Sequence, residues 1–186
     1  LRRAGIHSVN PVVDITNYVM LKTGQPLHAF DAARISSEII KVRRGRKAEK
    51  LELLNEDQIQ LDDDCLVIAS DKEAIALAGV MGGASSGVSS DTDCVLLESA
   101  FFNPVSIART ARKFNIQTDA STRFERGVDP NLSPKALEEV IALITEFCGG
   151  RLVFKETTCS DNHVQQKTWL TSGQTKLIKL SEPKFL

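Results

Sequence analysis

The stretch that most constrains the fold is residues 10–31, which read NPVVDITNYVMLKTGQPLHAFD. Asn10 is a favourable helix N-cap, and Pro11 suits the first helical position because its missing N–H would have no partner there. Apolar residues follow at helical spacing, which predicts a helix with one buried face. Gly24 is the expected left-handed stop, and Pro26 keeps the helix from resuming.

Three polar residues in this stretch are not explained by the helix: Asp14, Asn17 and His28. An asparagine inside a helix lowers its propensity, and a histidine within the apolar PLHAF needs a hydrogen-bond partner. One interpretation is structural, with Asn17 fixing the next loop and His28 satisfied in the core, since buried polar groups are usually hydrogen-bonded. The other is that they belong to a functional site.

Composition places the chain among ordinary globular proteins. Its 186 residues, 42% apolar and 25% charged, can bury the core of one large domain or two small ones. A net charge of −1 argues against general polyanion binding, but it leaves room for one folded RNA on a local basic patch. No apolar run is long enough for a signal peptide or a membrane span. Because the chain begins at Leu1 rather than Met, we expect a segment of a longer protein.

The cysteines indicate a reducing compartment. No CxxC spacing is present, and Cys65, Cys94 and Cys148 lie in apolar surroundings. Buried free thiols therefore fit better than disulfides or zinc, and we expect a cytoplasmic protein without a metal site.

Short apolar runs between polar turns predict an antiparallel or mixed sheet. The expected strands are residues 38–44, 51–54, 59–61, 65–69, 93–102 and 151–155. Further helices are expected from Pro104 and from Ser133, whereas the polar stretch 117–129 is typical of a structured surface loop or a ligand-facing turn. The three aspartates at 62–64 lack calcium-loop spacing and indicate a solvated turn. This order of elements predicts an α+β fold.

Two features point to a pocket. Residues 74–83, AIALAGVMGG, contain small residues that let a backbone or a ligand approach closely. Glu98 lies inside the apolar run 93–102, where an ionisable group is unfavourable unless it is paired or functional. Arg123 and Arg126 either pair with neighbouring acids or face a ligand. Spacing alone therefore favours a small-molecule pocket, with hydrolysis as one option.

Four stretches resemble, in the same order, the editing domain of the β subunit of bacterial phenylalanyl-tRNA synthetases. They are NPVVDITNYVMLKTGQPLHAFD, ALAGVMGG, LLESAFFNP and QTDASTRFERGVDP. The resemblance covers about residues 1–155 and implies a three-layer α+β sandwich of two β layers and one α layer. It also implies a domain over residues 1–158, with a linker and the start of the next module at 159–186.

The same resemblance implies hydrolysis of tyrosine wrongly esterified to tRNA(Phe). The parent enzyme of that family is an α2β2 heterotetramer that uses ATP and magnesium to join phenylalanine to the tRNA. Its synthetic site lies in the α subunit, so no cofactor is expected in this segment. The partners implied are misacylated tRNA(Phe) and the α subunit.

The resemblance also assigns site residues. His28 and Asn17 would be the polar groups that support catalysis, and Glu98 would contact the tyrosine hydroxyl. The side-chain slot would be bordered by Ala78, Gly79, Thr118 and Ala120. An alternative is a non-catalytic module of the same synthetase that docks tRNA or a subunit. A hydrolase unrelated to tRNA is disfavoured because no nucleophile constellation is present.

Overall fold

The computed structural model describes residues 1–36, 40–153 and 173–179, the last segment as backbone only. The helices are α1 Pro11–Thr23, α2 Pro104–Phe114, α3 Asp119–Arg126 and α4 Leu132–Cys148, with 3-10 turns at η1 Arg2–Ala4, η2 Ala32–Arg34 and η3 Ala84–Ser86. The strands are β1 Leu27–Asp31, β2 Lys41–Arg44, β3 Lys50–Glu52, β4 Gln58–Gln60, β5 Leu66–Ala69, β6 Ala74–Leu77, β7 Met81–Gly82, β8 Cys94–Ala100, β9 Arg151–Leu152 and β10 Gly173–Lys179.

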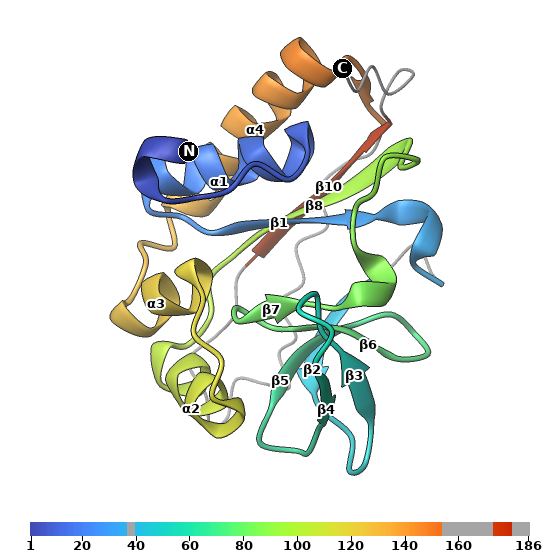
Figure 1. Ribbon diagram of the computed structural model, residues 1–186, viewed down its shortest axis with the longest axis vertical. Coiled ribbons are helices and arrows are strands. Elements are labelled where there is room, and N and C mark those ends of the chain that lie inside the picture. Colours follow the sequence, from blue (N-terminus) through green and yellow to red (C-terminus); the bar gives the residue numbers. More distant parts are fainter. Residues whose placement is uncertain (37–39, 154–172, 180–186) are drawn as a thin grey trace.

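The strands form two main sheets with antiparallel pairing. The first sheet has the order β1-β8-β10-β9 and the second the order β2-β5-β6-β7, and β3 and β4 form a separate hairpin. Figure 1 shows α1 and α4 covering one face of the first sheet, with the second sheet on its other side and α2 and α3 at the flank. This helix–sheet–sheet arrangement confirms the predicted α+β sandwich.

The predicted helix caps are present. The Asn10 side chain accepts a hydrogen bond from the Val13 N–H at 2.9 Å, and Gly24 has φ +81° and donates its N–H to the Met20 carbonyl. Asn103 caps α2 in the same way, ahead of a proline at the first helical position. Local sequence therefore sets where these two helices begin.

Alternation along β1 and β8 decides which side chains face the second sheet. Ala29 and Leu97 pack with α1 and α4 in one core cluster, whereas Phe30 belongs to the other cluster, between the sheets. Successive strand residues point to opposite faces. His28 and Glu98 therefore lie on the face that looks toward the second sheet.

The expected surface loop at 117–129 is wrong in part, because residues Asp119–Arg126 form α3. Thr118 and Ser121 make a capping box that fixes the start of this helix, and Phe124 is its buried anchor. Arg123 pairs with Asp119 at 2.7 Å rather than with the acids that follow it. The many polar residues of this stretch gave no helical pattern, because Phe124 is the one large apolar residue that α3 buries.

Other elements differ in detail from the prediction. β1 was not expected as a strand, and the end of the small-residue stretch 74–83 contains β7. Cys65 is buried as expected, but Cys94 and Cys148 are half-buried. Residues 38–39 and 154–155 of two expected strands, and the fourth cysteine, lie outside the described residues. β10 joins the first sheet from within the range assigned to a following module.

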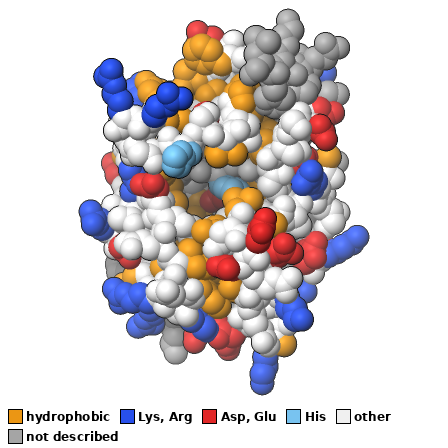
Figure 2. Space-filling model, in the orientation of Figure 1, with side chains coloured by type: hydrophobic (Ala, Val, Ile, Leu, Met, Phe, Trp, Pro, Cys, Tyr) orange, Lys and Arg blue, Asp and Glu red, His pale blue; other side chains and the backbone are white. Residues whose placement is uncertain are grey.

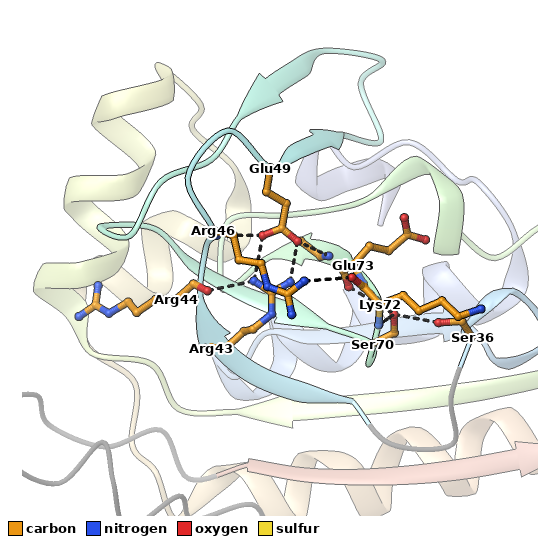
Figure 3. Close-up of polar contacts among 9 residues, drawn as sticks. Ser36, Arg43, Arg44, Arg46, Glu49, Ser70, Lys72 and Glu73 are labelled. Carbon is orange, nitrogen blue, oxygen red and sulfur yellow. Dashed lines mark hydrogen bonds and ion pairs between the residues drawn. The ribbon is translucent and has the colours of Figure 1, made fainter.

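At the far end of the second sheet, Glu49 holds three segments together (Figure 3). Its carboxylate accepts both arms of the Arg43 guanidinium, at 2.6 and 2.9 Å, and the backbone N–H groups of Arg46 and Ala74. Hydrogen bonds from Arg43 lower the pKa of Glu49 to about 2. This acid is fully satisfied and has a structural role.

Candidate functional site

A pocket opens between the two sheets, and its walls come from several regions far apart in sequence. Figure 2 shows the hollow near the middle of one face, with a histidine inside it. The start of β1, the β6–β7 turn and α3 all contribute to its lining, together with β8. The lining residues include His28, Gly79, Gly82, Glu98, Ala120 and Phe124.

Sheet register brings the two ionisable lining residues together. β1 and β8 pair so that His28 lies directly opposite Glu98, and paired residues of antiparallel strands project from the same face. No ion pair or hydrogen bond joins the two side chains in the described part of the chain. They form two separate polar points on an otherwise mostly apolar wall.

Glu98 is half-buried, and its carboxyl has no hydrogen-bond donor or counter-ion among the described residues. Burial raises the pKa of the Glu98 carboxyl to about 7. Near neutral pH the group therefore exists in both protonation states. In the ionised state it is a strong acceptor, and a hydroxyl donor from a ligand would offset its desolvation.

His28 is held as a neutral imidazole. Burial lowers its pKa to about 4. Its ring meets Phe30 edge to face, with centroids 4.4 Å apart, and its Nε2 is buried without a hydrogen-bond partner among the described residues. A neutral ring with one unused nitrogen can orient a water molecule or a polar group of a ligand.

The glycines of the β6–β7 region let this wall pack closely against its neighbours. A Cβ on Gly82 would lie 2.6 Å from the His28 ring, so only glycine leaves the imidazole in place. Gly79 has φ +67°, and a Cβ there would lie 2.8 Å from Ile107 and 2.9 Å from Phe102. Ala78 is fully buried directly before it and does not line the pocket.

α3 supplies the opposite wall. The Thr118 hydroxyl donates to the Val80 carbonyl at 2.8 Å and caps the helix, which links α3 to the turn that carries Gly79. Ala120 and Phe124 line the pocket, whereas Thr118 lies behind it. The small Ala120 side chain leaves room at the helix end.

Asn17 lies apart from these groups. It is half-buried within α1 and is not among the lining residues. The structure thus brings together four of the seven residues assigned from sequence, namely His28, Gly79, Glu98 and Ala120. The other three, Asn17, Ala78 and Thr118, do not line the pocket.

One residue beside the site was not expected from sequence. Gln25 is fully buried, and its amide donates to the carbonyls of Pro26 and Ala100 at 2.9 and 2.8 Å. These bonds tie the start of β1 to the end of β8, two residues beyond Glu98. The sequence signal was a polar residue between Gly24 and Pro26, which is also typical of an ordinary turn.

Within the described ranges, no cluster of three or more histidine, cysteine or acidic side chains has the arrangement of a metal site. None of the described helices has both the length and the apolar character needed to cross a membrane.

Residues 1–149 match the family model of the B3/4 domain, and the chain belongs to that family. Curated relatives carry the name phenylalanine–tRNA ligase beta subunit, which confirms the resemblance seen in the sequence. That of Photorhabdus laumondii is 46% identical over 97% of this chain, and that of Francisella tularensis is 53% identical over 82%. The chain spans 22% and 19% of the length of these two relatives.

Proposed function

We propose that this domain edits misacylated tRNA by hydrolysing the ester between tyrosine and tRNA(Phe). The observation that supports it best is Glu98, whose carboxyl has no hydrogen-bond donor or counter-ion among the described residues and lies on the wall of the pocket. The family of the chain and the name of its relatives, phenylalanine–tRNA ligase beta subunit, support an aminoacyl-tRNA ester as the substrate class.

The reaction needs selection of a hydroxyl. The synthetic site of such an enzyme binds phenylalanine in an apolar pocket. A pocket of this kind rejects tyrosine, which has one more hydroxyl, by only roughly 10²-fold. A second, hydrolytic site must therefore prefer that hydroxyl. The Glu98 carboxylate accepts a hydrogen bond from the phenol O–H of tyrosine. Phenylalanine leaves the carboxylate without a donor, which costs about 1–3 kcal/mol of binding free energy.

Hydrolysis itself needs a positioned water and stabilisation of the oxyanion. His28, neutral and with an unused Nε2, orients the water or the ester. Gly79 and Ala120 leave space for the ring, and Thr118 and Ala78 hold those walls in place. Asn17 does not line the pocket, so its support of catalysis stays a prediction from the resemblance. No general base is assigned, because an activated ester reacts readily with a well-placed water.

The complete protein would then be the β subunit of an α2β2 phenylalanine–tRNA ligase that uses ATP and magnesium at a site outside this segment. In that assembly its partners would be tRNA(Phe) and the α subunit, and it would act in the cytoplasm.

The test is deacylation of Tyr-tRNA(Phe) and Phe-tRNA(Phe) by the complete subunit with its partner. Glu98→Gln should lower the rate for the tyrosyl ester by about 10- to 100-fold, which is 1–3 kcal/mol, and leave the slow phenylalanyl rate unchanged. Glu52→Gln, an exposed acid on β3, is the matched control. Unchanged tyrosyl deacylation in Glu98→Gln would refute the role of Glu98. No deacylation by the parent protein would favour a docking module.

A further inference from the structure

α2 is cationic on one face and apolar on the other. Residues 103–118 contain Arg109, Arg112 and Lys113 and no acid. Ile107, Thr110 and Ala111 are buried, while Val105, Arg109 and Arg112 follow at spacings of four and three along the exposed side. The longer α4 carries three acids and one lysine, so this charge pattern is particular to α2.

Among the described residues, the two arginines of this exposed stripe have no acidic partner. Lys113 pairs with Asp62, but no carboxylate among the described residues contacts Arg109 or Arg112. Two like charges three residues apart on a helix destabilise it by a few tenths of a kcal/mol. The two arginines therefore do not stabilise the fold through an ion pair of their own among the described residues. Arg43, in contrast, pairs with Glu49.

The stripe lies one helix thickness from the pocket. Ile107, on the inner side of α2, would touch a Cβ on Gly79, and α2 packs against α3, whose Ala120 lines the pocket. The width of a helix with its side chains is about 10 Å. Figure 2 shows lysine and arginine side chains gathered at the end of the molecule where α2 lies, on the face with the hollow.

We propose that Arg109 and Arg112 bind phosphates of the RNA strand whose 3′ end enters the pocket. This inference rests on the proposed function for the identity of the RNA. A guanidinium donates two parallel hydrogen bonds to one phosphate, so two arginines three residues apart suit two neighbouring phosphates. The net charge of −1 confines such binding to a local patch of this kind.

The experiment measures binding of non-aminoacylated tRNA(Phe) to the complete subunit with its partner at several salt concentrations. Arg109→Gln/Arg112→Gln should make the negative slope of log K against log salt shallower by about 1.4–1.8. At 0.1 M salt this corresponds to a loss of affinity of roughly 25- to 60-fold. The control is Lys47→Gln/Lys50→Gln, which removes the same charge from two exposed residues, one in the turn between β2 and β3 and one at the start of β3. Thermal unfolding of both variants should match that of the parent.

An unchanged slope in the α2 variant, or an equal loss in the control, would overturn the proposal. Undetectable binding by the parent chain at low salt would overturn it too, and a large loss of thermal stability in the α2 variant would show that the arginines hold the helix instead. Since this tRNA carries no amino acid, the result does not depend on deacylation. Failure of the editing function would therefore appear in a different measurement.

Discussion

On the helix-covered face of the first sheet, Ser99 of β8 and Ser133 of α4 form a closed set of hydrogen bonds. Each hydroxyl donates to the backbone carbonyl of the other residue, at 2.9 and 2.6 Å, and the two oxygens lie 3.0 Å apart. On the opposite face, the neighbouring Glu98 and its strand partner His28 have no such bonds among the described residues. β8 thus has a polar side chain that is fully hydrogen-bonded on one face and another that is available to a ligand on the other.

Two neighbouring residues of β8 therefore have different roles: Ser99 stabilises the fold, whereas Glu98 is available to a ligand. Buried polar groups are normally paired because an unmade hydrogen bond costs about 1–3 kcal/mol. The serine pair follows this rule and fixes α4 on the sheet. Glu98 and His28 depart from it at the pocket, where a ligand can supply the missing partners.

The largest effect on stability is expected at Gln25, whose amide joins the two strands of this comparison. Gln25→Leu leaves the buried carbonyls of Pro26 and Ala100 without this donor and should lower the free energy of unfolding by about 2–4 kcal/mol. Urea denaturation measures it, with Gln58→Leu on the exposed side of β4 as control. A loss below about 0.5 kcal/mol, the usual range for surface changes, would contradict the role of the Gln25 amide in joining the two strands.

The pocket face should be unfavourable for stability at alkaline pH. The pKa of Glu98 rises to about 7 in the folded protein, so between pH 4.5 and 7 the unfolded chain loses its proton first and stability falls. Glu98→Gln removes this penalty and should stabilise the fold by up to about 3 kcal/mol at pH 8, with little change at pH 4. Chemical denaturation at the two pH values tests the sign, and a destabilised variant at pH 8 would contradict it.

A smaller change is expected on the helix face. Ser133→Ala removes the donor to the Ser99 carbonyl and should cost about 1–2 kcal/mol at every pH between 4 and 8. The comparison predicts opposite signs for Ser133→Ala and Glu98→Gln at pH 8. If both variants lose stability equally, the two faces do not differ in the way proposed.

Capping chemistry made much of the fold predictable. The starts of α1 and α2 follow from Asn-Pro pairs that act locally, and the α+β class follows from the order of elements. α3 was missed because its single buried anchor, Phe124, gives no periodicity over eight residues. β1 was missed because LHAFD is short and its pairing partner lies far away in the sequence.

Part of the candidate pocket could be predicted from the sequence. His28 and Glu98 stand out as polar residues within apolar runs, but nothing in their spacing shows that β1 and β8 place them opposite each other. Gln25 could not be found, since its role depends on a carbonyl 75 residues away. Register and long-range hydrogen bonds are set by tertiary packing, which a local pattern does not encode.

The most direct test of the central claim is a ¹³C NMR titration of the Glu98 carboxyl with and without bound tyrosine. The account predicts a pKa near 7 alone, a clear decrease when tyrosine is added, and no decrease with phenylalanine. A pKa near the ordinary glutamate value, or the same response to both amino acids, would contradict recognition of the hydroxyl by this carboxylate.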